Sequence, residues 1–227
     1  MLDPADRQAL VGHAADRDRP RDGQVEMSQP GHDPSAAGSA ITLVCEAGAR
    51  ICAADGPETV VNRAASVVFA GLGDRHAHEL PDALRPGQTQ FFVAGCFFVT
   101  PGRQHQMLIG NIGFPPEQRR LLIPIDGGNP GQVIASGMPL LLADTEAAPD
   151  FRQYLKTSRM GSAIYAPLIW QGDTIGLFIM AAQARWTMRQ ADLEILRAIA
   201  PTITAAWMAH GGPEWLRSEY MEAIRNK

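Results

Sequence analysis

Cys96 is the residue whose type most directly suggests chemistry, and it lies in the apolar stretch FFVAGCFFV. A cysteine that faces a pocket can act as a nucleophile, a redox centre or an attachment point for a cofactor. A reactive thiolate needs a nearby positive charge, and no Lys, Arg or His neighbours Cys96 in the sequence. The favoured interpretation is therefore a small core residue, since free cysteine is among the most buried residue types.

The other cysteines, Cys45 and Cys52, are seven residues apart in a segment with helical periodicity. Two helical turns place their Cα atoms about 10 Å apart, which is too far for a disulfide within one helix. We interpret both as apolar residues on a buried helical face, with a redox pair or an intermolecular disulfide as the alternative. Three cysteines without a CxxC pair indicate neither a disulfide framework nor a zinc site.

Three histidines have the chemistry to bind haem or a metal ion: His76 and His78 in DRHAHE, and His105 in RQHQ. A His-x-His pair suits a metal ion when its segment is extended. However, the first segment is polar and His105 adjoins a turn, so solvated loop positions are the favoured interpretation. The sequence predicts no metal site.

The segment GGNPGQ (127–132) is a glycine-rich loop that leads into a predicted helix. Such a loop offers backbone N–H groups and the positive end of a helix to an anion or a carboxylate. It lacks the Lys and Ser/Thr of a phosphate-binding P-loop, so nucleotide hydrolysis is not indicated. A tight turn without a ligand is the alternative.

The composition excludes several classes of protein. Hydrophobic residues make up 45% and charged residues 19% of the chain, as in soluble globular proteins. A net charge of −4 without a basic stripe argues against a nucleic-acid surface. The apolar runs are shorter than the roughly 18–20 residues of a membrane span, and the N-terminus has charges where a signal peptide is apolar. We expect a cytoplasmic protein that binds neither nucleic acid nor membrane.

The patterns divide the chain into three parts. Residues 1–37 are rich in Asp, Arg, Gly, Pro and Ala and lack apolar periodicity, which predicts a flexible N-terminal tail that is dispensable for folding. Residues 38–210 predict a folded domain. Residues 211–227 predict a C-terminal helical extension that follows the GGP break.

Within the domain, the first helix is expected over about 39–54, and a second one opens at DGP (55–57), with the proline in its first turn. The predicted buried face of the first helix comprises Ile41, Val44, Cys45, Ile51 and Cys52. The remaining predicted elements are a hairpin from TQFFVAGCFFVT to HQMLIGNIG, a strand in QRRLLIPID, a short helix after GGNPGQ, a strand in MPLLLAD, a helix from Asp150 to Gly161, a hairpin at 163–181 and a long helix over 187–208 capped by Thr187.

Three segments, in this order, resemble the GAF domain family. GGNPGQVIASGMPLLLADTEAAPDF is similar to the middle of a GAF domain, MGSAIYAPLIWQGDTIGLFIMAA to its signature hairpin, and WTMRQADLEILRAIAPTITAAW to its C-terminal helix. The resemblance covers about residues 40–208 and implies an α+β fold. A central antiparallel sheet would have helices on one face and, on the other, a loop and helix layer that forms a ligand pocket. A sheet covered on both faces explains why the hairpin at 163–181 is almost continuously apolar.

The resemblance also implies which residues surround the pocket. The candidate ligand-binding residues are Cys96, Asp126, Asn129, Gly131, Gln132, Asp144, Tyr154 and Tyr165. For Asp144 the alternative is a cap for the turn after its strand, and for Tyr154 it is ordinary helix packing. No catalytic residue and no particular cofactor is indicated, and bilin attachment is not expected because the sequence has no Cys-His pair.

By this resemblance, the expected function is a small-molecule-sensing regulatory module without its own catalysis. Its output would pass through a protein partner or through self-association. Two alternatives stay open: a thiol-dependent redox enzyme similar to the free methionine sulfoxide reductases, and a dimerisation domain without a pocket. The enzyme is the less favoured, because the later loops lack the cysteines that the reductase family uses there.

A homodimer is also expected. In GAF-like folds the first and last helices of the domain pack side by side on the sheet, and here the last helix and its extension carry additional apolar residues. A second copy would cover this surface. These residues are Ile195, Trp207, Trp215, Leu216, Tyr220 and Ile224.

Overall fold

Six antiparallel strands form the sheet at the centre of the fold. A computed structural model describes residues 34–147 and 160–225. The strand order is β3-β2-β1-β6-β5-β4, so that pairing of β1 with β6 joins two hairpins at the centre. The strands are β1 (Phe92–Val99), β2 (His105–Ile112), β3 (Leu122–Pro124), β4 (Leu140–Leu142), β5 (Ser162–Trp170) and β6 (Asp173–Ala182).

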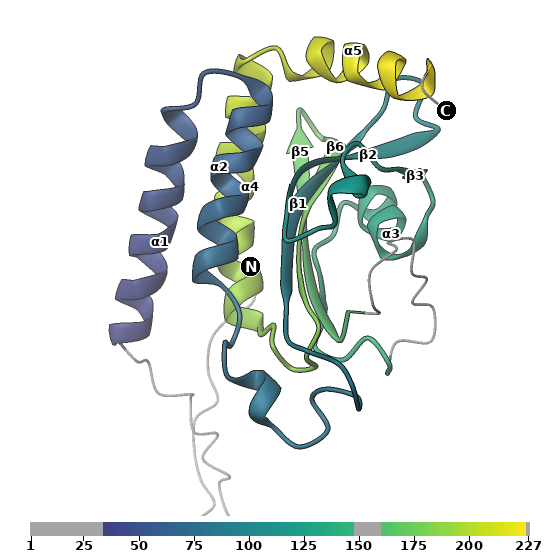
Figure 1. Cartoon of the computed structure of the whole chain (residues 1–227). Coiled ribbons are helices and arrows are strands. Elements are labelled where there is room, and N and C mark those ends of the chain that lie inside the picture. The colour runs from purple at the N-terminus through teal and green to yellow at the C-terminus, as the bar shows by residue number, and fades with distance from the viewer. Residues whose placement is uncertain (1–33, 148–159, 226–227) are drawn as a thin grey trace, which may run out of the picture. The chain divides into compact units, whose positions relative to one another are not determined.

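Two helices cover one face of the sheet, and a third lies outside them (Figure 1). α2 (Pro57–Gly71) and α4 (Gln190–Ala209) pack against the strands, whereas α1 (Pro34–Cys52) packs chiefly against α2 and α4. The first and last helices of the domain therefore do lie side by side, as predicted. However, α2 takes the place on the sheet that the sequence assigned to the first helix.

The buried face of α1 only partly matches the predicted one. Ile51 is fully buried and Val44 packs partly buried against the same core, as predicted, whereas Ala47 is buried in place of Ile41, Cys45 and Cys52, which are exposed. The interpretation of both cysteines as buried apolar residues is therefore wrong. The reason is that α1 covers other helices with a narrow stripe, and the periodicity alone does not show which of two adjacent stripes faces inward.

The start of α1 also differs from the expected domain boundary. The helix begins at Pro34, inside the segment 1–37 that the composition assigned to a tail. Residues 1–33 lie outside the described residues, as does most of the helix predicted from Asp150 to Gly161.

α2 begins as its sequence predicts. Gly56 is the N-cap residue in an extended conformation, and Pro57 is in the first turn, where its missing N–H removes no hydrogen bond. The helix then buries an apolar stripe against β1, β2 and α4, which comprises Val60, Val61, Ala64, Ala65, Val67 and Val68.

α4 (Gln190–Ala209) has its N-cap residue two positions after the predicted cap, Thr187. Its N-cap residue is Arg189, whose backbone N–H donates to the Asp192 carboxylate at 2.8 Å. The hydroxyl of Thr187 donates instead to the carbonyl oxygen of Ala184 at 2.8 Å, in the turn before the helix. The Asp192 carboxylate thus accepts the hydrogen bond from the backbone N–H of the N-cap residue.

α5 (Gly212–Arg225) is the predicted C-terminal helix, and much of its apolar surface packs within the chain. The Trp207 ring at the end of α4 is buried and stacks on Phe98, with 3.8 Å between the ring centroids. Trp215 meets the Trp207 ring edge-on at 5.6 Å, and Leu216 is buried. Ile195 is partly buried against the same core. These four residues are therefore largely covered within the chain, whereas Ile224, of the same predicted surface, is 41% exposed.

The hairpin of β5 and β6 is confirmed, and its turn comprises Gln171 and Gly172. Both residues have positive φ, 49° and 88°, as a two-residue turn with the twist of its strands requires. Further along β6, a Cβ atom at Gly176 would lie 2.5 Å from the carbonyl oxygen of Phe97 on β1. The absence of a side chain at Gly176 therefore permits the close pairing of the two central strands.

α3 (Gly128–Ser136) lies over the other face of the sheet. Buried clusters fill both sides: one under α2 and α4, and one between the strands and α3. The fold is α+β, and the expectation that both faces of the hairpin are covered is confirmed.

Candidate ligand-binding site

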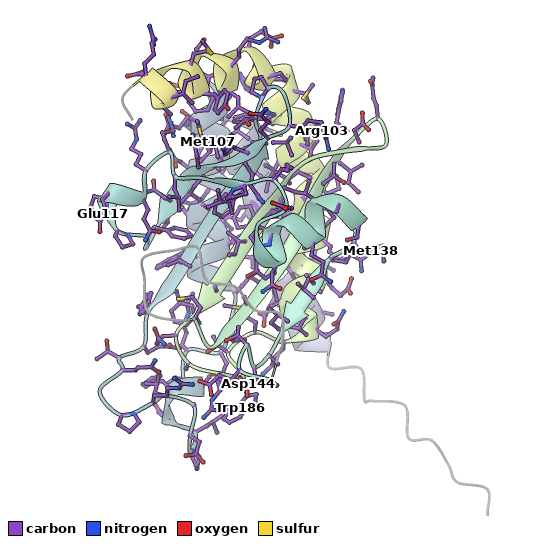
Figure 2. The ribbon with its side chains drawn as sticks, turned by 90° about the vertical axis from the view of Figure 1, so that its right-hand side faces the viewer. Arg103, Met107, Glu117, Met138, Asp144 and Trp186 are labelled. Atoms are coloured by element: carbon purple, nitrogen blue, oxygen red, sulfur yellow. The ribbon has the colours of Figure 1, made fainter. Side chains whose placement is uncertain are left out.

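The face of the sheet toward α3 is the one on which the sequence predicts a ligand site, and Figure 2 views it with α3 in front of the strands. Alternate residues of each strand point to this side. The α3-side core, as we call its buried cluster, comprises Val93, Phe97, Leu108, Phe114, Ile123, Val133, Ile134, Met160, Ala163, Tyr165, Leu177, Ile179 and Ala181.

Glycines bring the first turn of α3 close to the preceding loop. Gly128 has a φ of 55°, in the left-handed region, and a Cβ at Gly131 would lie 2.7 Å from the Cα of Asp126. Gly137 ends the helix with a φ of 64°. This geometry places the positive end of a nine-residue helix against the edge of the α3-side core.

Asn129 and Tyr165 meet at this end of α3. Asn129 is 6% exposed and Tyr165 3% exposed, and the Asn129 side chain adjoins the Tyr165 hydroxyl. Burial raises the pKa of the Tyr165 phenol, while Asn129 acts in the opposite direction. The phenol is therefore neutral near pH 7 and can donate a hydrogen bond.

The amide donor of Asn129 is incompletely satisfied. Its Nδ2 has no hydrogen bond of regular geometry with a described residue, and its interaction with Tyr165 only partly offsets the effect of burial on the pKa of that phenol. A buried donor without a partner costs about 1–3 kcal/mol. An acceptor oxygen placed beside Asn129 and Tyr165 would remove this cost, so the pair has the chemistry of a small polar recognition site.

Gln106 and Gln118, which the sequence analysis did not single out, are two further buried amides. Gln106 shares the α3 side of β2 with Leu108, and its Nε2 donates to the carbonyl oxygens of Pro124 and Ile125, both at 3.3 Å. These bonds hold the loop before α3 onto the sheet. The Gln106 Oε1 and both amide atoms of Gln118 have no hydrogen-bond partner in the described part of the chain. A polar residue at an inward position of an apolar strand is the signal that points to Gln106.

The predicted site residues nearest Asn129 in sequence differ in burial. Gly131 is buried and shapes the first turn of α3, whereas Asp126 and Gln132 are exposed. Neither exposed side chain belongs to the α3-side core. Asn129 and Tyr165 are therefore the candidate ligand-binding side chains at this end of α3, and Gly131 contributes through its backbone. Asp126 and Gln132 are not candidates.

Asp144 lies at the other end of the sheet, beside Trp186 (Figure 2). Its carboxylate accepts a hydrogen bond from the Glu146 N–H at 2.9 Å and is 3.8 Å from the Arg185 guanidinium. This is the turn cap that the sequence analysis gave as its alternative. Tyr154 lies outside the described residues.

Cys96 points away from the candidate site. It is fully buried in the cluster under α2 and α4, on the side of the sheet opposite to Tyr165. Burial raises the pKa of the Cys96 thiol well above its usual value. The interpretation as a core residue therefore fits its position, and its inclusion among the ligand-binding residues does not.

The three histidines have partners typical of loop and surface positions. His76 is 2.9 Å from Glu79, and this hydrogen bond raises the pKa of His76. The Nδ1 of His78 is 2.9 Å from the carbonyl oxygen of Arg75, and that of His105 is 3.2 Å from the Tyr220 hydroxyl. Across residues 34–147 and 160–225, no three His, Cys, Asp or Glu side chains gather as they would around a metal ion.

Comparison with known families agrees with this arrangement of sheet and helices. The sequence model of the GAF domain matches residues 92–207, which is just over half of the chain. The chain therefore belongs to the GAF domain family. A comparison with curated proteins gives no match.

Solved GAF structures share the fold at low sequence identity. The GAF domain of a phosphoenolpyruvate-protein phosphotransferase from Coxiella burnetii has 16% identity and a TM-score of 0.62, over 78% of this chain and 97% of that one. The corresponding Acinetobacter domain has 12% identity and a TM-score of 0.59, over 80% and 97%. The free methionine-R-sulfoxide reductase of Neisseria meningitidis, solved with its substrate, has 18% identity and a TM-score of 0.61, over 80% and 95%. At such identities the likeness shows the fold alone.

None of the described helices is both long and apolar enough to cross a membrane.

Proposed function

We propose that this protein is a small-molecule-sensing regulatory module without its own catalysis, and that the ligand binds between α3 and the sheet. One observation carries the proposal: the buried Nδ2 of Asn129 lacks a hydrogen bond of regular geometry and interacts with the Tyr165 hydroxyl at the first turn of α3. A bound water or ligand oxygen is a common partner for a buried polar group of this kind. Membership of the GAF family, which includes regulatory domains, supports the same function.

The chemistry of the site defines a class of ligand. Asn129 supplies an amide donor, the neutral phenol of Tyr165 supplies a second polar group, and the N-terminus of α3 adds a partial positive charge. The surrounding residues of the α3-side core are apolar. We infer that the ligand is a small, compact metabolite that carries a carbonyl or carboxylate oxygen.

The positions of the cysteines support a sensor over a thiol-dependent enzyme. The Cys96 thiol is buried on the far side of the sheet, and its raised pKa keeps it protonated and unreactive. Cys45 and Cys52 are exposed on α1, which packs on the other helices. None of the three faces α3, although reductases of free methionine sulfoxide share this fold.

Binding measurements on paired variants test the ligand site. Native mass spectrometry of the purified protein, followed by a thermal-shift screen of metabolites, identifies compounds that bind. We expect Asn129→Ala to weaken binding about tenfold or more, the loss of one or two good hydrogen bonds. Gln132→Ala, an exposed position on the same helix, is the matched control and should bind as the wild type does. Equal binding by both variants would reject the site.

We also propose that the output passes through self-association or a protein partner in the cytoplasm. The exposed side of α1 supports a homodimer that forms through the helices. On this side Ile41 is 64% exposed and lies on the same helical face as the exposed Cys45 and Cys52. Light scattering should then give about twice 24.5 kDa. Ile41→Asp should lower this mass, whereas Met138→Asp, equally exposed on the α3 side, should not. A monomeric wild-type protein would contradict the homodimer.

A further inference from the structure

A groove lies where the hairpin of β1 and β2 meets the corner between α4 and α5, away from the α3-side core. Its volume is about 270 Å³, and it is open to solvent along one side. The floor is apolar and comprises the buried Phe98, Trp207 and Leu216, with Ile175 and Met208 beside them. Because the floor residues are packed against one another, the groove is a preformed feature of the corner.

Two arginines stand at the rim of this groove, Arg103 from the hairpin turn and Arg217 from α5. Both are exposed, and neither forms an ion pair with a described residue. Arg120 and Arg185, in contrast, are held by carboxylates of this chain. Arg103 and Arg217 thus give the groove a positive rim that its own surroundings do not neutralise.

The backbone of the hairpin turn fixes where Arg103 lies. Arg103 has a φ of 52° and follows Gly102, whose φ is 79°. Positive φ values of this kind are typical of tight hairpin turns, as at Gln171 and Gly172 in the other hairpin. The turn is closed by the Arg103 N–H, which donates to the Thr100 carbonyl oxygen at 3.0 Å. Figure 2 shows the resulting place of Arg103, at the tip of the hairpin beside α5.

We propose that this groove docks a short segment of a partner protein in which a bulky apolar side chain is flanked by acidic residues. The apolar side chain would lie on Trp207 and Leu216, and the carboxylates would pair with Arg103 and Arg217. Small-molecule sites enclose most of their ligand, so an open groove suits a peptide better. Aromatic floors and arginines are also the residues that dominate binding energy at protein interfaces.

This inference rests on the proposed function, in which the output passes to a partner. Its test requires no small molecule, so the docking surface and the ligand site can fail separately. The full chain is immobilised, and phage displaying random dodecapeptides are selected on it. Enriched peptides are then synthesised with a fluorescent label, and their affinity is measured by fluorescence polarisation.

We expect the enriched peptides to combine a Phe, Trp, Leu or Met with neighbouring Asp or Glu. The double variant Arg103→Glu with Arg217→Glu should bind them at least tenfold more weakly. Arg225→Glu, which reverses one charge on α5 outside the groove, should bind as the wild type does. Equal melting temperatures would confirm that all three proteins are folded.

Three outcomes would overturn the proposal. The first is selection of no peptides, or of peptides without acidic residues. The second is equal binding by the double variant and the wild type. The third is a fall in the mass of the unliganded protein, by light scattering, in the double variant alone. That result would mean that a second copy of this chain covers the groove.

Discussion

Arg120 and Glu219, 99 residues apart in the chain, share a hydrogen bond of 2.6 Å between the Arg120 Nε and the Glu219 carboxylate. The same guanidinium donates to both oxygens of Glu58 on α2, at 3.0 and 2.9 Å, and lies over the Trp215 ring. Arg120 therefore fastens α5 and α2 to the loop between β2 and β3. Its side chain is only 11% exposed, so water screens these pairs less than it does a surface ion pair.

This link predicts an acid-sensitive contribution to stability. Burial acts to raise the pKa of Glu58, but Arg120 outweighs it and holds that pKa below the ordinary 4.5. A depressed carboxyl pKa stabilises the fold above the unfolded value, and this stability is lost as pH falls through the folded value. Urea unfolding between pH 7 and 3 should show a decline that begins near 4.5, and Glu58→Gln should reduce its steepness.

At neutral pH, Arg120→Ala should destabilise the protein by about 1–3 kcal/mol, because two partly buried carboxylates lose their donor. Arg119→Ala is the matched control: Arg119 is 61% exposed and 3.7 Å from Glu58, so its loss should cost less than about 1 kcal/mol. Equal effects of the two variants in urea unfolding would show that the link is not specific.

Two glycines of the β5–β6 hairpin should respond differently to substitution. Gly176→Val forces a side chain against the Phe97 carbonyl oxygen and should cost more than about 3 kcal/mol. Gly172 has open space around it but a φ of 88°, so Gly172→Ala should cost about 1–2 kcal/mol. Thermal unfolding gives the order of the two melting temperatures, and the reverse order would contradict the register of β6 with β1.

The thiols should separate into two classes. Cys45 and Cys52 are exposed, whereas Cys96 is fully buried and its thiol pKa is raised. Mass spectrometry after brief iodoacetamide treatment should show two modified thiols in the native protein and three in urea. Rapid native modification of Cys96 would show that the sheet opens on the side of α2 and α4.

Removal of residues 1–33 should leave the melting temperature unchanged, because that segment carries little apolar surface. Removal of residues 1–52 should lower it strongly, since it also deletes Ala47 and Ile51 from the core. Circular dichroism of the two truncated proteins tests the boundary. Unfolding of the shorter deletion would contradict it.

Local signals were sufficient for much of the fold. The turn at Gln171 and Gly172 and the start of α2 at Pro57 both follow from residue types that restrict the backbone. The strands of the central hairpins were predictable because they are long and apolar on both faces. The edge strands β3 and β4 are only three residues each, and the pattern predicted a strand in each segment without fixing these limits.

The candidate site was less predictable, because it depends on which face each side chain takes. An apolar strand does not reveal that Cys96 faces α2 and α4 while Tyr165 faces α3. The buried face of α1 depends in the same way on helices that lie outside its own sequence. Asn129 was found because it lies in a loop with a recognisable composition, and Gln106 was missed because it follows the polar turn residues that precede its strand.

The two short edge strands bear on how copies of this protein can meet. An open strand edge is a template on which another chain can add a strand and start aggregation. Here β3 ends at Pro124, which has no N–H to offer, and Pro139 directly precedes β4. With three residues each, β3 and β4 offer few backbone groups on which another chain could pair. Growth of an intermolecular sheet from these two strands is therefore disfavoured, which in the described part of the chain leaves the helical faces better suited to ordered contacts between copies.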